Sequence, residues 1–410
     1  MIGDRTPLEA SHRGLDWLNL LLAGMGGAYG AYIPVYLTAQ AWTQTRIGVL
    51  LTVGTVVSLL CQVPAGLLVD AFPRARRRLM AGAILASGAL PLVLAVWPRP
   101  FPVTLAMAVQ SAAGSLLGPA IAALSLSLAG RAGLAERLGR NGRFGSIGAG
   151  LGAAVLGACG TWLPGRSVFV VAALLTLAAW VALRRLPSGG VPDAAPPAPD
   201  ESRISGALAL LRDRRLAVFA LCVVLFQTSS IAILQLAAVS VTGRLGSRAS
   251  LVIAACLIVP QLVVAWLSPW LGRAAERFGR RTVLLAGFAT LPVRGALFAW
   301  VRNPYALVPV QVLEGAGGAV FGVMLPLVAA DLTRGKNHYT LCLSLLGLAA
   351  GLGTAISTAL AGWVADGYGK PAAFWVLAGA GLAAVVLAAV AMPETRPALS
   401  AREHDPHREA

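Results

Sequence analysis

Two ionisable side chains, Arg294 and Glu314, lie inside long apolar stretches of this 410-residue sequence. The stretches, 282–301 and 305–330, are separated by a short turn, so as antiparallel helices they would lie side by side. At 1.5 Å per residue, Arg294 would lie about 10 Å and Glu314 about 15 Å from the turn. Long side chains can bridge this difference, and we predict an Arg294–Glu314 ion pair. Glu314 would then be a protonation site or substrate ligand, or a structural tie between two helices.

A second group of charges follows the apolar stretch 46–69, where "GLLVDAFPRARRR" places an aspartate before a cluster of arginines. A related sequence, "GRAAERFGRR", follows the stretch 249–271. An acidic group at a helix end and arginines beyond it can form charge-assisted hydrogen bonds across helices. The alternative is that the arginines only anchor the chain at a membrane surface.

No combination of residues predicts an enzyme. The sequence holds no complete GxGxxG, GxxxxGK[ST] or GxSxG motif, and its four histidines lie outside the apolar stretches. The five cysteines lie inside them without CxxC spacing, which is typical of small apolar residues and not of zinc sites or disulfides. We therefore expect no enzymatic activity, no metal and no cofactor.

Composition predicts a membrane protein. The chain is 57% hydrophobic and 12% charged, whereas soluble domains carry about 25% charged residues. Apolar runs of about 20 residues cross a bilayer, and in lipid their backbones must be helical. Twelve such stretches occur: 15–37, 46–69, 79–97, 101–129, 142–163, 167–184, 216–240, 249–271, 282–301, 305–330, 339–364 and 371–392.

The net charge of +16 is explained by membrane topology. Arginines gather in the connections between apolar stretches, so a nucleic-acid partner is not expected. With the N-terminus inside the cell, about 25 basic residues fall on the cytoplasmic side and about 7 on the other. Both termini are therefore predicted to be cytoplasmic.

The chain divides into two similar halves. "AGLGAAVLGACGTWL" at 149–163 recurs as "AGLGTAISTALAGWV" at 350–364. A Pro- and Ala-rich segment, "PSGGVPDAAPPAPDES", is typical of a flexible linker. We predict a cytoplasmic tail at 1–14, a six-helix bundle at 15–184, a cytoplasmic linker at 185–215, a second six-helix bundle at 216–392 and a cytoplasmic tail at 393–410. Parallel six-helix repeats are typical of one transporter architecture.

These features resemble the major facilitator superfamily over nearly the whole chain. Its loop signature, G-x-x-x-D-x-x-G-[RK]-x-[RK], corresponds to Gly66, Asp70, Pro73, Arg74 and Arg76, and in the second half to Gly272, Glu276, Gly279, Arg280 and Arg281. The resemblance implies an all-α fold of twelve transmembrane helices in two pseudo-symmetric bundles, with these residues latching the halves together on the cytoplasmic side. Pro73 departs from the signature glycine. Because proline cannot adopt positive φ, the first turn must differ from the usual one.

The resemblance also implies that the first, fourth, seventh and tenth helices line a central cavity. Its polar candidates are Tyr29, Tyr32, Gln110, Gln227, Gln235 and Gln311. They would bind a ligand, or instead bond neighbouring helices. Because the tenth helix lines the cavity and the ninth is peripheral in this family, Glu314 is favoured over Arg294 for proton coupling. Asp16, at the predicted start of the first helix, would favour the helix dipole and is a further proton-coupling candidate.

The resulting hypothesis is a secondary active transporter of the inner membrane of a bacterium that works by alternating access. We expect proton-coupled efflux of a small organic molecule, as an antiporter, by a monomer whose partners are substrate, protons and membrane lipid. Against this, the glycine-rich fifth stretch lacks the Gly-Pro pair common in antiporter members of the family. One alternative is a proton-linked uptake symporter for a sugar or metabolite. Another is a non-transporting membrane receptor or assembly factor, which the short loops and tails disfavour.

Overall fold

The computed structural model describes residues 7–186, 210, 212–245, 249–301, 303–334 and 338–395. Within these residues the chain forms helices and turns and no β-strand. Ten helical stretches among them are long and apolar enough to cross a membrane, and one of these, of 61 residues, is long enough to cross twice. The predicted all-α membrane fold is confirmed.

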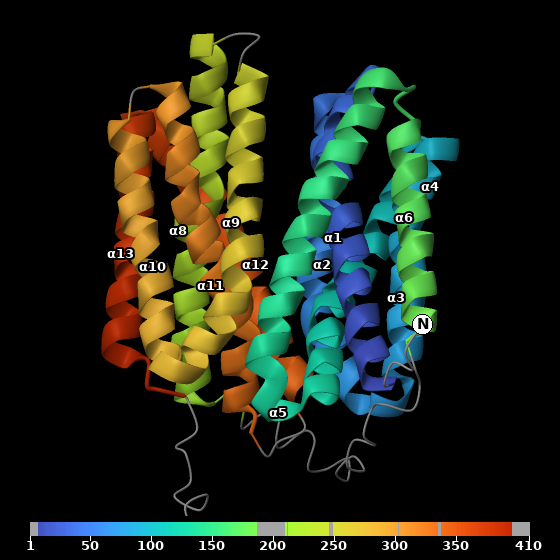
Figure 1. Cartoon of the computed structure of the whole chain (residues 1–410). Coiled ribbons are helices and arrows are strands. Elements are labelled where there is room, and N and C mark those ends of the chain that lie inside the picture. Colours follow the sequence, from blue (N-terminus) through green and yellow to red (C-terminus); the bar gives the residue numbers. More distant parts are fainter. Residues whose placement is uncertain are drawn as a thin grey trace, which may run out of the picture.

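The helices form two bundles that stand side by side (Figure 1). The N-terminal bundle contains α1 (Pro7–Ala39), α2 (Gln44–Ala71), α3 (Arg76–Ser87), α4 (Ala89–Val96), α5 (Pro100–Trp162) and α6 (Ser167–Arg184). The C-terminal bundle contains α8 (Arg214–Leu245), α9 (Ala249–Phe278), α10 (Arg280–Trp300), α11 (Leu307–Leu332), α12 (Tyr339–Tyr368) and α13 (Lys370–Ala391). Helices α3 and α4 follow each other at Gly88 and together make one span, while α5 makes two.

Helix α5 corrects the sequence prediction between the fourth and fifth spans. Residues 130–141 were expected to form a loop because they are rich in charge, but they are helical. The break is confined to Gly130, whose φ of 64° and ψ of −179° lie outside the helical region. Glycine adopts positive φ without steric cost, so the chain turns at this one residue and resumes as helix at Arg131. The charged residues after it belong to a helix.

The two copies of the loop signature turn differently, as the Pro73 substitution predicted. In the second copy Gly279 has φ of 90° and joins α9 directly to α10. In the first copy Phe72 has φ of −123° and a 3₁₀ turn, Pro73–Ala75, leads into α3. Proline suits the first position of such a turn because its φ is fixed near −65°. The N-terminal copy therefore reverses direction without a residue at positive φ.

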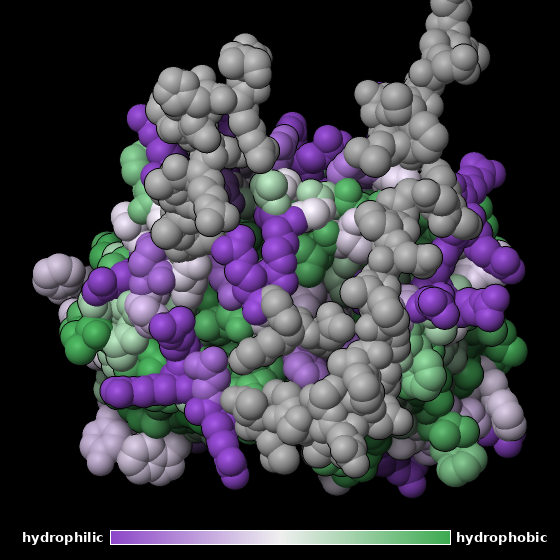
Figure 2. Space-filling view, turned by 90° about the horizontal axis from the view of Figure 1, so that it is seen from below, coloured by the Kyte–Doolittle hydropathy of each residue, from purple (hydrophilic) through white to green (hydrophobic). Residues whose placement is uncertain are grey.

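The two bundles meet at one end of the molecule, at the bottom of Figure 1, where α5 and α12 approach each other. We call this the closed end. An apolar cluster crosses it, in which Leu134, Ala135 and Leu138 of α5 share a core with Leu271 and Ala275 of α9. Figure 2 looks onto this end and shows many hydrophilic side chains on it.

Candidate functional site

The closed end contains two helix crossings, in each of which a glycine faces a backbone carbonyl of the other half. A Cβ atom on Gly66 of α2 would lie 2.9 Å from the Thr340 oxygen of α12. A Cβ atom on Gly272 of α9 would overlap the Ala135 oxygen of α5. Gly272 follows Gly66 by 206 residues, and Thr340 follows Ala135 by 205. The two halves thus make two similar contacts with each other, each between a glycine and a backbone carbonyl.

Asp70, in the last turn of α2, reaches across the α2–α12 crossing. Its carboxylate accepts hydrogen bonds from the backbone N–H groups of Thr340, at 3.2 Å, and Leu341, at 2.8 Å. Amides in the first turn of a helix have no acceptor within the helix and carry the positive end of its dipole. Asp70 therefore caps a helix of the opposite half, which ties the two halves together.

The arginines of the first signature copy do not pair with Asp70 in a hydrogen bond or ion pair within the described part of the chain. Arg74 is exposed. Arg76 is half-buried and points toward α5 of its own half, with Nη1 3.5 Å from the Ala123 oxygen. Asp70 thus contacts the other half through backbone amides, and within the described residues neither Arg74 nor Arg76 shows a hydrogen bond or ion pair to that half.

The charged side chains of the second copy bond within the C-terminal half. The guanidinium of Arg280 is buried and donates to Glu276 at 2.9 Å, to Asp331 at 3.2 Å and to the Ala275 oxygen at 2.8 Å. Arg281 donates to the Ala389 oxygen of α13. This copy therefore braces α9, α10, α11 and α13 against one another, and its contact with the other half is made by Gly272.

Glu394, which follows α13, completes this brace. Its carboxylate accepts from the backbone N–H groups of Arg280, at 2.9 Å, and Arg281, at 3.2 Å. These amides open α10 and, like those of α12, have no acceptor within their helix. A Cβ atom on Gly279 would approach the Glu394 carboxylate to 2.5 Å. Glycine at this position thus gives both the turn and the space for the cap.

The predicted ion pair between Arg294 and Glu314 is confirmed. Ser230 of α8 joins it: its hydroxyl donates to the carboxylate of Glu314, with oxygen distances of 2.8 and 3.0 Å, and its carbonyl accepts from Arg294 at 3.2 Å. The Arg294 side chain is 2% exposed and that of Glu314 is 30% exposed. The group therefore links α8, α10 and α11 and leaves the acid partly accessible.

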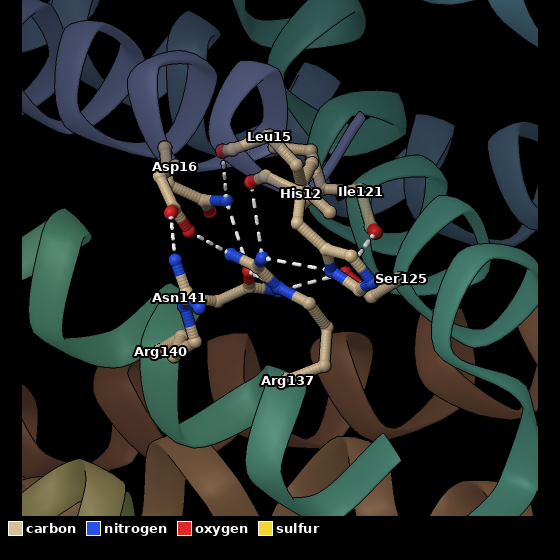
Figure 3. Close-up of polar contacts among 9 residues, drawn as sticks. His12, Leu15, Asp16, Ile121, Ser125, Arg137, Arg140 and Asn141 are labelled. Carbon is tan, nitrogen blue, oxygen red and sulfur yellow. Dashed lines mark hydrogen bonds and ion pairs between the residues drawn. The ribbon is translucent and has the colours of Figure 1, made fainter. Parts of the chain in front are cut away.

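Asp16 lies in a different setting from the one predicted. Helix α1 begins at Pro7, so Asp16 is not at its start, and the side chain is 5% exposed. Its two carboxylate oxygens accept from Arg137 and Arg140 of α5 (Figure 3). The interpretation as a helix-dipole residue at the helix start is wrong, because Asp16 lies within α1 and its buried charge is balanced by ion pairs.

Other polar groups complete the cluster in Figure 3. Arg137 donates to Asn141 at 2.9 Å and to the His12 carbonyl at 3.1 Å. Asn19 donates to Asn141 at 3.1 Å. Burial, followed by the nearby Arg137 guanidinium, lowers the pKa of His12 below its ordinary value. Arg137 and Arg140 were not predicted as site residues, because the charged segment that contains them was expected to be a loop.

A cavity of about 580 Å³ lies within the N-terminal half, between α1, α2 and α5. Its wall is mainly apolar, and its polar members are Asn19, Ser58, Ser87, Gln110 and Ser111. Gln110 is thus a predicted cavity residue that the structure places on the wall. Asn19 was not predicted, and it connects the cavity to the buried Asp16 cluster through Asn141.

Four of the other five predicted cavity residues do not line this cavity. Tyr32 packs in an aromatic cluster with Tyr36 and Phe169, with ring centroids 6.5 and 5.9 Å away. Gln311 is completely buried, and Gln235 is exposed. Gln227 lies beside Gly353 of α12. The side chain of Tyr29 lies outside the described residues.

Two six-helix halves that meet at one end, with a mainly apolar cavity in the first half, form the architecture of a membrane transporter. A model of the Major Facilitator Superfamily matches residues 17–268 and 232–407. An uncharacterized MFS-type transporter of Mycobacterium tuberculosis is 33% identical over 393 residues, which are 93% of each chain. This protein therefore belongs to the Major Facilitator Superfamily, whose members are transporters and not enzymes.

Further comparisons concern parts of the chain or the fold alone. A multidrug resistance protein B homolog of M. tuberculosis is 33% identical over 141 residues, 34% of this chain and 26% of that one. The MFS transporter FucP in its outward conformation has a TM-score of 0.74 at 13% identity, covering 92% of this chain and 97% of that one. The human organic anion transporter MFSD10 has a TM-score of 0.68 at 17% identity, covering 95% and 100%.

Proposed function

We propose that this transporter exports a small organic molecule from a bacterial cell in exchange for protons. The 141-residue stretch shared with a protein named for multidrug resistance supports export. The mainly apolar cavity with a few uncharged polar groups suits a partly apolar molecule. The arginine distribution favours the inner membrane with both termini in the cytoplasm. The protein is proposed to act as a monomer.

In an alternating-access mechanism, a structure whose halves meet at one end is closed to one side of the membrane and open to the other. His12 near the start of α1 contacts Arg137, and Glu394 after α13 contacts Arg280, so both helix ends lie at the closed end. If these ends face the cytoplasm, the closed end is the cytoplasmic end, and the arrangement is outward-facing. The Asp70 cap on α12 and the crossings at Gly66 and Gly272 would then be the contacts that break when the carrier opens inward. The buried brace around Arg280 stays within one half, so it would move as part of that half.

Glu314 is the proposed proton carrier, and the observation that carries this proposal is its ion pair with Arg294. Its carboxylate has one charged partner and one hydroxyl, and it is 30% exposed, so the protein does not enclose it completely. Asp16 is 5% exposed and held by two arginines. Ionisable groups inside a membrane span are costly and are kept for function or for structure. We assign function to Glu314 and structure to Asp16.

The test compares the wild type with Glu314→Gln in everted membrane vesicles that carry a pH gradient, with ethidium and rhodamine as reporter dyes. Glu136→Gln is the control, because Glu136 is an exposed glutamate of α5. The wild type and the control should accumulate dye at rates that depend on pH. Glu314→Gln should lose gradient-driven accumulation, since glutamine retains hydrogen bonding but cannot carry a proton.

Two results would contradict the proposal. An unchanged pH profile in Glu314→Gln would remove the coupling role of this residue. Dye movement out of the vesicles along with protons would indicate uptake by a symporter, which is the opposite direction.

A further inference from the structure

Arg131 connects the two halves at a place that the loop signature does not include. It follows the kink at Gly130, and its guanidinium reaches α11 of the C-terminal half. Nη1 lies 2.6 Å from the Ala330 oxygen and Nη2 3.5 Å from the Thr333 oxygen. Helix α11 ends at Leu332, so these carbonyls belong to its C-terminal end. The last carbonyls of a helix have no donor within it and carry the negative end of the dipole.

Asp70 acts on the next helix in the chain. Helix α11 ends at Leu332 and α12 begins at Tyr339, so one short connection joins them. Arg131 binds the helix end before this connection, and Asp70 binds the helix start after it. Each charge has the sign that its helix end favours: a cation at a C-terminus and an anion at an N-terminus.

We propose that Arg131 is a gate residue and that it forms, with Asp70, a two-point clamp by which the N-terminal half holds the α11–α12 connection at the closed end. The clamp exists only while the halves touch. It stabilises the state closed at this end and is released when the carrier opens there. This inference rests on the alternating-access part of the proposed function, and it is independent of proton coupling and of transport direction.

The continuity of α5 explains why the two signature copies behave differently. If Glu276 acted as Asp70 does, it would cap an amide of α5 near Ala135, which faces Gly272. Helix α5, however, resumes at Arg131, so the amide of Ala135 lies beyond the first turn and already has an acceptor in its helix. Glu276 has no free amide to bind there and pairs with Arg280. The second contact between the halves comes from Arg131.

The experiment measures the distance between spin labels by double electron–electron resonance in detergent. The labels replace Phe72 and Phe278, which are exposed, lie one in each half, and end α2 and α9. The five native cysteines are replaced by alanine in every variant. The variants are Arg131→Gln, Arg131→Lys, Asp70→Asn as reference, and Arg78→Gln as control, an exposed arginine of α3.

Arg131→Gln should increase the ratio of open to closed distances about tenfold, because it loses hydrogen bonds from a charged group. Asp70→Asn should shift it in the same direction. Arg131→Lys should shift the ratio less, since lysine keeps the charge but lacks the fork that reaches two carbonyls. Arg78→Gln should leave it unchanged.

Equal distance distributions for Arg131→Gln and Arg78→Gln would overturn the proposal. The proposal would also be overturned if Arg131→Lys shifted the ratio of open to closed distances as much as Arg131→Gln did while Asp70→Asn did not shift it. A melting temperature for each variant shows that the measured population is folded. A negative result in the Glu314→Gln transport test would leave these outcomes unaffected, so the two proposals can fail separately.

Discussion

Asp16 and Glu314 are acidic residues inside helices that bond arginines, yet their surroundings give them different properties. Asp16 is held by Arg137 and Arg140, and Arg137 is itself fixed by Asn141 and His12. Glu314 has Arg294 and the Ser230 hydroxyl and is partly open. A charge with many fixed partners is costly to change, whereas a charge with few partners and some access can exchange a proton.

Replacement of Asp16 should therefore affect stability first. Asp16→Asn removes the charge that balances Arg137, whose side chain is 1% exposed. Loss of one partner of a buried ion pair costs about 3 kcal/mol or more. The melting temperature in detergent should fall clearly, while Asp366→Asn, at an exposed position of α12, should lie close to the wild type. Equal melting temperatures would show that the cluster does not brace α1 against α5.

The arginine contacts of Asp16 and Glu314 also differ in how well they can be predicted from the sequence. Arg294 and Glu314 are close across a short turn, so spacing alone indicated their contact. Asp16 and Arg137 are far apart in the chain, and their contact depends on how α1 packs on α5. No periodicity within either segment carries that information. Tyr32 shows the same limit: its spacing allowed a cavity position, but packing turned it toward Phe169.

At the scale of elements, α5 performs several tasks along its length. Its kink at Gly130 presents Arg131, its next turns hold Asp16, and its later turns pack closely on α1. The glycines of this stretch make the close packing possible, because small residues four apart allow helices to approach. The sequence did not predict that the charged residues before them are helical, since charge in a membrane chain usually marks a loop.

Gly148 and Gly150 provide a test position and a matched control for the packing of α5 on α1. A methyl group on Gly148 would overlap the Leu20 carbonyl of α1, whereas no atom lies within 4 Å of a Cβ on Gly150. Gly148→Ala should lower stability by about 1–3 kcal/mol through overpacking, and Gly150→Ala should change it little. The measurement is the melting temperature of each purified variant. A similar loss in both would contradict this assignment, because alanine is favoured over glycine inside a helix and Gly150→Ala has no clash that could lower stability.

At the scale of the whole molecule, the two halves repeat their sequence but not all of their contacts. The glycine crossings are similar in both halves, because Gly66 and Gly272 each face a carbonyl of the other half. The charged contacts differ, because α12 begins at its crossing and α5 runs through its own. Both crossings therefore have close backbone contact. The clamp of Asp70 and Arg131 is an additional contact, which the N-terminal half makes with α11 and α12.

Because the glycine crossings are separate from the charged contacts, we predict that a methyl group added at a crossing opens the closed end without changing any charged residue. Gly272→Ala would overlap the Ala135 carbonyl, and backbone atoms cannot move aside as a flexible side chain can. Overpacking of about 1–3 kcal/mol acts on the closed state alone, since the crossing separates when the carrier opens. The spin-label distances should therefore shift about tenfold or more toward the open population.

Gly66→Ala should act in the same direction, because it meets the Thr340 carbonyl at the equivalent crossing. Gly362→Ala on α12, where no atom lies within 4 Å of an added Cβ, is the control. If Gly272→Ala lowered the melting temperature but left the distances unchanged, the crossing would be ordinary packing in both states. If it shifted the distances while Asp70 and Arg131 stayed intact, contact between the helix backbones would be shown to control the closed end alongside the clamp.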